Sequence, residues 1–166
     1  MKSRTARAGA GPRRQAAFVL ASVVVFATTA AFAATSATAH SGTVAAKPTV
    51  TIAHTDVGPL LANHAGYTVY MFVRDKRNKD ECRKIKGCEK DWPAVTTTGK
   101  PIAGKGVKKS LLGSIPYKGT LRELTYKGHP LHTYRFDTSK GSVINIGNRQ
   151  FGGAWYGLNA NGKVVK

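Results

Sequence analysis

The sequence predicts an all-β domain: a small sandwich or barrel-like antiparallel sheet built from two pseudo-repeats, with at most one or two short helices. Three observations favour this fold class. Short segments rich in β-branched and aromatic residues recur along the chain. Turn signals made of Gly, Pro, Asn and Asp separate these segments. No amphipathic helical pattern extends beyond two turns.

The predicted strands follow one another from residue 49 onward. Apolar residues alternate with polar ones over 49–54, and residues 67–73 are dense in β-branched and aromatic side chains. Further strands are expected at 92–98, 121–126, 131–136, 154–158 and 163–165. Turns are expected at 56–59, 127–130 and 159–162, a loop at 99–113, and a charged excursion with one short helix at 74–91.

The first 39 residues have the pattern of a signal peptide. A basic segment at 2–14 precedes an apolar segment at 16–34, and Ala37-Thr38-Ala39 supplies the small-x-small cleavage pattern. Cleavage after Ala33 and a retained membrane anchor are the alternatives. We therefore predict a signal peptide at 1–39, a flexible leader at 40–48, a single β domain at 49–166, and a secreted protein, extracellular or cell-wall associated, with no transmembrane segment after cleavage.

The two cysteines, Cys82 and Cys88, agree with export. In an oxidising compartment, two cysteines six positions apart predict one short-loop disulfide. In the chain-entropy model, closing such a loop contributes about 2–3 kcal/mol. A metal–thiolate pair and a redox couple are the alternatives, but neither the Cys-x2–4-Cys spacing nor the Cys-x-x-Cys spacing is present.

An internal repeat organises the predicted domain. Residues 66–75 align with residues 128–137 at a constant offset, and a tryptophan follows each copy. The two repeats extend over about 60–98 and 122–160, and they suggest pseudo-twofold packing of two β units. The aligned positions of this repeat motif are Tyr70 with His132, Phe72 with Tyr134, and Asp75 with Asp137, and the tryptophans that follow the two copies are Trp92 and Trp155.

These motifs resemble a family of bacterial secreted proteins and lipoproteins with a repeated Tyr-x-(Phe/Trp/Tyr)-x-x-Asp motif. The residues that carry the resemblance are Tyr70, Phe72 and Asp75; Cys82, Cys88, Trp92 and Pro93; Thr125, Tyr126, Gly128, Pro130 and Leu131; Tyr134 and Asp137; and Gly152, Gly153 and Trp155. The resemblance implies an exported repeat protein of unknown function and no established activity, cofactor or catalytic residue. The lipid-accepting cysteine of the lipoproteins is missing, which implies a protein that is not lipid-anchored. His132 stands where the second copy usually has Tyr.

The repeat motif predicts mainly structural roles. Residues two apart in a strand share a face, so Tyr70 and Phe72 are expected to pack in the core, as are their partners in the second copy. Asp75 and Asp137 are expected to cap turns by accepting backbone N–H bonds. The alternative is that these two carboxylates meet at the pseudo-twofold axis and bind a cation or act as an acid–base pair. The tryptophans are expected to be hydrophobic anchors, with sugar stacking as the alternative.

Histidines provide the remaining metal candidates. Cleavage after Ala39 would make His40 the N-terminal residue, whose amine and imidazole can bind one copper ion. His129 and His132 are three positions apart, a poor chelate in a strand because the two side chains face opposite sides. An exported metal-binding or redox protein, with copper at His40 or a cation at Asp75 and Asp137, is therefore the alternative hypothesis.

The charge favours an anionic partner. The chain has 26 Lys and Arg residues against 8 Asp and Glu, a formal net charge of +18. A basic domain outside the cell meets anionic envelope polymers, lipid headgroups and acidic glycans. A merely soluble basic surface and an envelope protein without a ligand are the alternatives. The residues predicted to bind such a partner are Arg74, Lys76, Arg77, Lys84, Lys86, Lys105, Lys108 and Lys109.

The sequence contains no recognisable catalytic motif. It has no Gly-x-Ser-x-Gly, no His-Glu-x-x-His, no P-loop and no dinucleotide fingerprint. Aromatic RNA-binding runs and zinc fingers are also absent from the sequence. We therefore expect a secreted binding or structural module, not an enzyme, with no cofactor and no specific nucleic-acid partner.

Overall fold

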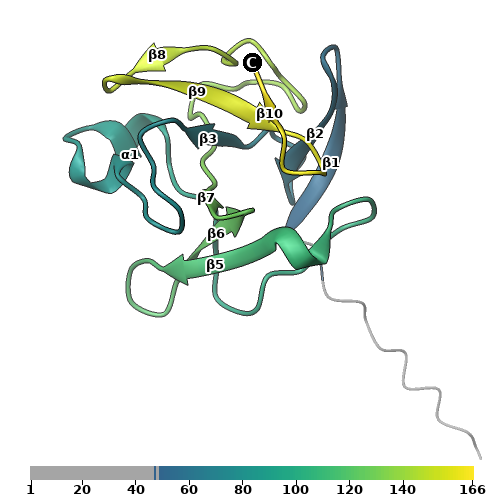
Figure 1. Cartoon of the computed structure of the whole chain (residues 1–166), viewed down its shortest axis with the longest axis horizontal. Coiled ribbons are helices and arrows are strands. Elements are labelled where there is room, and N and C mark those ends of the chain that lie inside the picture. Colours follow the sequence, from purple (N-terminus) through teal and green to yellow (C-terminus); the bar gives the residue numbers. More distant parts are fainter. Residues whose placement is uncertain (1–46, 48) are drawn as a thin grey trace, which may run out of the picture. The chain divides into compact units, whose positions relative to one another are not determined.

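The computed structural model describes residue 47 and residues 49–166. The predicted signal peptide, His40 and the rest of the predicted leader apart from Lys47 lie outside the described residues. The prediction of an all-β fold is confirmed: the described strands form several antiparallel sheets that do not close into a barrel, and the helical elements are short (Figure 1). The strands are β1 (Val50–Thr55), β2 (Gly58–Asn63), β3 (Tyr70–Phe72), β4 (Thr96–Thr97), β5 (Leu112–Pro116), β6 (Arg122–Tyr126), β7 (His129–Pro130), β8 (Arg149–Gln150), β9 (Gly153–Leu158) and β10 (Val164–Val165).

Strands β1 and β2 form a hairpin closed by a two-residue turn. Thr55 pairs with Gly58, and the Thr55 hydroxyl donates to the Gly58 carbonyl oxygen at 2.6 Å. Gly58 has a φ of +97°, a conformation that favours glycine and that the tight turn requires. Leu60 and Leu61 are fully buried, so β2 directs two large side chains into the interior.

The second sheet contains β10, β9 and β3, with β8 paired to β9. In the pairing of β3 with β9, Phe72 lies opposite Trp155. A Cβ atom at Gly153 would lie 2.6 Å from the Phe72 ring, so only glycine fits at this position. The Gly-Gly-x-Trp segment therefore lets an aromatic side chain from β3 pack directly onto β9.

The third sheet has β6 at its centre, with β4 and β5 on either side and β7 paired to its end. All four residues from Glu123 to Tyr126 are buried. A central strand covered on both faces loses the alternation of buried and exposed residues that sequence patterns rely on. This sheet lies toward the lower part of Figure 1, and β8 and β9 toward the upper part.

Several predicted boundaries are wrong. The segment 131–136 is not a strand: His132 makes only isolated bridges, to Tyr70 and to Ala94, as the chain passes between two sheets. The predicted strands at 67–73 and 92–98 are reduced to β3 and β4. Strands β2, β5 and β8 were not expected; in particular, Leu112 begins β5 inside the predicted loop 99–113.

The charged excursion is built around the disulfide. It contains a 3₁₀ turn, η1 (Cys82–Lys84), and one short helix, α1 (Cys88–Asp91), as predicted for a single short helix. A second 3₁₀ turn, η2 (Lys109–Leu111), precedes β5. Cys82 and Cys88 form the predicted disulfide, and both residues are fully buried. Among the described residues, no helix is long and apolar enough to cross a membrane.

Candidate functional site

Equivalent positions of the two repeats meet at the centre of the domain. Tyr70 and His132 exchange both backbone hydrogen bonds: the Tyr70 amide donates to the His132 carbonyl at 2.8 Å, and the His132 amide donates to the Tyr70 carbonyl at 2.9 Å. An antiparallel pair joined by two such bonds has a local twofold axis between its residues. The geometry is the arrangement expected of pseudo-twofold packing.

The side chains of this pair cross to the opposite repeat. The Tyr70 hydroxyl donates to Asp137 Oδ2 at 2.9 Å, and His132 Nε2 lies 2.9 Å from Asp75 Oδ2. Each residue of the pair therefore holds the aspartate of the other copy. The backbone is also equivalent in the two copies: the Asp75 amide donates to the Phe72 carbonyl, and the Asp137 amide donates to the Tyr134 carbonyl.

Four aromatic rings continue the symmetry as one stack. Trp92 and Trp155 stack at its centre, with ring centroids 4.0 Å apart and planes within 5°. Phe72 stacks on Trp155 at 4.2 Å, and Tyr134 packs on Trp92 at 4.4 Å. Both tryptophans are fully buried, so the structure places them as hydrophobic anchors in the core.

Asp75 and Asp137 have different surroundings. Asp75 accepts from the Glu81 backbone amide at 2.8 Å, in the turn-capping role expected for it, and Asp137 accepts from the Asn145 side-chain amide at 2.6 Å. Burial raises the pKa of Asp137. No hydrogen bond described here joins the two aspartates, and each is held by a separate set of partners. The predicted cation pair of Asp75 and Asp137 stays a hypothesis that the structure does not support.

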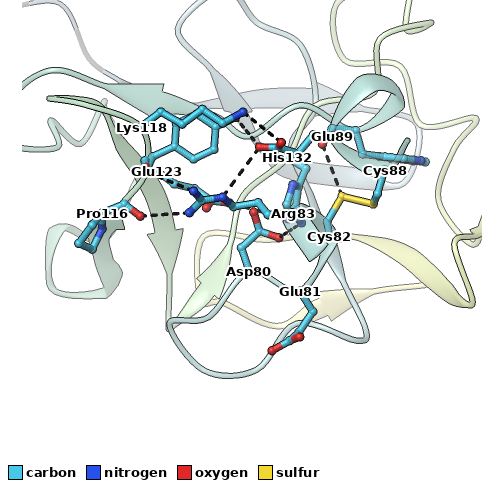
Figure 2. Close-up of polar contacts among 12 residues, drawn as sticks. Asp80, Glu81, Cys82, Arg83, Cys88, Glu89, Pro116, Lys118, Glu123 and His132 are labelled. Atoms are coloured by element: carbon cyan, nitrogen blue, oxygen red, sulfur yellow. Dashed lines mark hydrogen bonds and ion pairs between the residues drawn. A yellow bond between two sulfur atoms is a disulfide. The ribbon is translucent and has the colours of Figure 1, made fainter. Parts of the chain in front are cut away.

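His132 belongs to a group that we call the buried acidic cluster, consisting of Asp75, Asp80, Glu123 and His132. His132 Nε2 lies 3.9 Å from Glu123 Oε1, and ligand atoms of Asp80, Cys82 and His132 lie within 4.8 Å of one another. The side chains of Asp75 and Glu123 are 0% exposed, and Asp80 is 6% exposed. Figure 2 shows Asp80, Glu123 and His132 gathered beside the disulfide.

The cluster strongly perturbs the protonation of its carboxyls. Burial, followed by the charges of Asp80 and Asp75, raises the pKa of Glu123 to about 9. Burial also raises the pKa of Asp80. Neither Glu123 oxygen has a hydrogen-bond partner within the described residues. Glu123 is therefore protonated at neutral pH.

Three loops bring basic side chains together on the outside of the domain. The Asn78 amide donates to the Gly128 carbonyl at 2.7 Å, and the Lys127 amide donates to the Leu111 carbonyl at 2.7 Å. Arg77 Nη1 also donates to the Lys127 carbonyl at 3.4 Å. We call the result the basic three-loop surface; its exposed members are Lys76, Arg77, Lys79, Lys108, Lys109 and Lys127.

An open pocket of about 220 Å³ lies among these loops. Its lining includes Arg77 and Lys127 together with the polar side chains of Asn78, Ser110 and Thr125, and it includes no carboxylate. Two cations and several hydrogen-bonding groups around one hollow form a suitable environment for an anionic group.

The other predicted basic residues are exposed but are distributed differently. Arg74 donates to the Phe151 carbonyl at 2.9 Å, and Lys84 pairs with Glu81 at 2.8 Å. Lys86 and Lys105 are exposed and lie outside the basic three-loop surface as defined here. The eight predicted residues thus divide, with Lys76, Arg77, Lys108 and Lys109 converging on one surface.

The predicted histidine sites receive no support. His129 is half-buried in β7, where burial and the charge of Lys127 lower its pKa. No described contact joins it to His132, which turns instead to Asp75 and Glu123.

The sequence patterns do not point to three residues of these sites. Glu123 and Asp80 were not singled out as candidate site residues, and Lys127 was counted as part of a turn. The sequence does contain one signal for Glu123, which is a charged residue inside the predicted strand 121–126. Such a residue is rarely buried unless it is paired, so a buried glutamate in this strand would indicate a specific partner.

Residues 51–96 match a protein family described as a secreted repeat of unknown function. The matched segment contains nearly all of β1, the whole of β2 and β3, and the first copy of the repeat motif from Tyr70 to Trp92, and it ends inside β4. This match confirms the predicted resemblance for that segment, and the family's description supports an extracellular location. No curated protein and no solved structure matches the chain.

Proposed function

We propose that this protein is a secreted binding module that holds an anionic polymer of the cell envelope on its basic three-loop surface, without catalysing a reaction. The family description supports a secreted module in general. The choice of an anionic partner rests on the distribution of charge over the described residues.

The single observation that carries the proposal is that the acids of the cysteine loop are either buried or already ion-paired. Asp75 and Asp80 are buried, and Glu89 and Asp91 are ion-paired with Lys118 and Arg135. The neighbouring cations of the basic three-loop surface point outward and make no ion pair within the described part of the chain. The outer surface is therefore more basic than the loop's composition suggests, which favours a polyanion.

A polymer fits this surface better than a lipid bilayer. Membrane-surface binding usually combines basic residues with large apolar side chains that enter the acyl region. The exposed large apolar residues of the described chain are Val57, Val73, Phe136 and Ile144, and none of them lies in the three loops. The exposed side chains of the loops are cations and hydrogen-bonding groups, which suits the phosphate or carboxylate groups of a soluble polymer.

A binding titration tests the proposal. Fluorescently labelled polyphosphate, with polygalacturonate as a carboxylate polymer, is titrated with the protein in about 0.05 M and about 0.5 M NaCl. We expect binding at low salt that weakens roughly tenfold or more at high salt, because exposed charges are screened. Vesicles containing anionic lipid serve as the membrane comparison, and stronger binding to vesicles than to either polymer would contradict the proposal.

Charge-reversal variants locate the binding surface. Lys109→Glu combined with Lys127→Glu should weaken polymer binding roughly tenfold, because two exposed cations are inverted at one surface. Arg149→Glu combined with Lys166→Glu makes the same change in net charge. Strand β8, which carries Arg149, and the C-terminus lie at the opposite end of Figure 1 from β5. Equal weakening by both pairs would mean that net charge, not this surface, governs binding.

A further inference from the structure

We propose that the buried acidic cluster is a binding site for one divalent transition-metal ion, held by carboxylate oxygens and by the imidazole of His132. This proposal does not depend on the binding of a polymer, because the cluster lies inside the domain and the basic three-loop surface lies outside. It also differs from the copper site at His40 and the pairing of Asp75 with Asp137.

The donor atoms have suitable spacing. His132 Nε2 lies 2.9 Å from Asp75 Oδ2 and 3.9 Å from Glu123 Oε1. Donors around a tetrahedral zinc ion lie about 3.3 Å apart when the bonds are about 2.0–2.1 Å long. The observed separations bracket this value, so a small movement of the Glu123 side chain completes the spacing. Asp80 lies within 4.8 Å of His132 and supplies a further carboxylate.

The unpartnered atoms point to a ligand. Both oxygens of Glu123 and Oδ2 of Asp80 are buried without a hydrogen-bond partner in the described residues. A buried carboxyl with no partner is costly, and native structures ordinarily satisfy such groups. Glu123 is fully buried, and its Oε1 faces His132. A metal ion bonded to these atoms would satisfy several of them at once.

Among the described residues, no lysine or arginine forms an ion pair with the cluster. The Arg83 backbone amide donates to Asp80 Oδ1 at 3.2 Å, but its guanidinium donates to the carbonyls of Pro116 and Tyr117 at 3.4 and 3.1 Å and lies over the Tyr117 ring (Figure 2). Three carboxyls in one buried site then require protons or a cation.

The second half of the pseudo-twofold centre provides an internal comparison. There, Tyr70 donates to Asp137, Asn145 donates to the same carboxylate, and the described residues place no second carboxylate on the tyrosine. That arrangement is satisfied by the protein alone. The half centred on His132 replaces the tyrosine by a metal-binding side chain and adds Asp80 and Glu123. Within the described residues, only the half of the pseudo-twofold centre that contains His132 therefore combines an imidazole with several carboxylates.

The donor set selects the class of metal. Imidazole suits zinc, copper, iron and nickel, and carboxylates also suit manganese, whereas calcium takes oxygen ligands. Cys82 is not a ligand, because its sulfur belongs to the disulfide. One imidazole and up to three carboxylates therefore fit Zn²⁺ or Mn²⁺ and disfavour Ca²⁺.

Calorimetric titration of the untagged, chelator-treated protein with ZnCl₂, MnCl₂ and CaCl₂ tests the site. We expect one Zn²⁺ or Mn²⁺ per chain and no comparable uptake of Ca²⁺. Absence of stoichiometric Zn²⁺ and Mn²⁺ binding by the folded protein would overturn the proposal.

Two variants assign the binding to this cluster. Glu123→Gln keeps the shape of the side chain and should weaken metal binding roughly tenfold or more. His132→Tyr installs the side chain found at the equivalent position of the first copy and should abolish binding. Glu81→Gln changes a partly exposed acid of the same loop, which pairs with Lys84, and should leave metal binding unchanged. Circular dichroism confirms folding, and unchanged stoichiometric binding by either folded cluster variant would overturn the assignment.

Discussion

Tyr70 and His132 face each other across the centre of the domain, and each holds the aspartate that belongs to the other's repeat. Two backbone hydrogen bonds of 2.8 and 2.9 Å join the pair, and side-chain contacts of 2.9 Å lead from it to Asp137 and Asp75. Neither copy of the motif completes its own contacts. The two segments therefore hold each other in place through these contacts.

Removing the Tyr70 hydroxyl should destabilise the domain. Tyr70→Phe deletes the donor to the buried Asp137 carboxylate, and losing a hydrogen bond to a buried charged group costs about 1–3 kcal/mol of unfolding free energy. Urea denaturation monitored by fluorescence measures this change. Tyr67→Phe is the control, because the Tyr67 hydroxyl makes no hydrogen bond within the described residues. Equal stability of both variants would contradict the role of the crossed contact.

The stacked tryptophans should dominate the stability of the core. Trp155→Ala removes a fully buried ring that stacks on Phe72 and Trp92, so we expect a loss of about 3–5 kcal/mol. The near-ultraviolet circular dichroism of the stack should weaken at the same time. Phe136→Ala removes a ring that is 52% exposed and should cost less than about 1 kcal/mol. A loss at Phe136 as large as that at Trp155 would contradict this assignment of the core.

Glu123 should make the protein less stable as the pH rises. Its pKa is raised from 4.5 to about 9 by burial and by the charges of Asp80 and Asp75, with a small opposing effect of Arg83. Between these pH values the folded chain keeps a proton that the unfolded chain loses. The unfolding free energy should therefore fall by about 1 kcal/mol per pH unit in this window, and the raised pKa of Asp80 acts in the same direction.

The variant Glu123→Gln isolates this effect. Its amide does not titrate, so its stability should depend less on pH than that of the parent protein between about pH 5 and pH 9. Urea denaturation at several pH values, with EDTA present to keep metal away, provides the comparison. Parallel pH profiles for the two proteins would show that Glu123 titrates normally, contrary to the buried cluster described above.

The disulfide should stabilise the charged loop without being open to reductants. Cys82→Ser combined with Cys88→Ser should lower the unfolding free energy by about 2 kcal/mol, the chain-entropy contribution of a short loop. Both cysteines are fully buried, so dithiothreitol should reduce the native protein far more slowly than the denatured protein. Mass spectrometry after thiol alkylation measures the two rates, and equal rates would contradict the burial of the disulfide.

Local patterns predicted the fold class, the disulfide and the strands with strong alternation. Val50 and Ile52 identify β1, and the aromatic run ending at Phe72 identifies β3. The alignment of the two copies showed which positions are equivalent. It did not show that Tyr70 contacts Asp137 and not Asp75, because equivalence in sequence does not determine which copy supplies the partner.

The buried acidic cluster depended on tertiary structure. Glu123 lies on β6, which is central in its sheet, so the period-two pattern that would place a glutamate at the surface fails there. Asp80 lay among neighbouring lysines and arginines and was counted as a surface charge that reduces the basicity of the loop. The structure shows that Asp80 is buried beside His132, so its charge does not offset the basic side chains on the outer surface.

Mapping the residues that contact the polymer shows directly whether the basic three-loop surface is the binding site. The amide resonances of an isotopically labelled protein would be followed by NMR during titration with polyphosphate at low salt. We expect the largest shifts in residues 76–79, 108–112 and 127–128, and we expect them to disappear when the salt concentration is raised. Shifts concentrated around β8 and the C-terminus, or no shifts at low salt, would contradict binding at the basic three-loop surface.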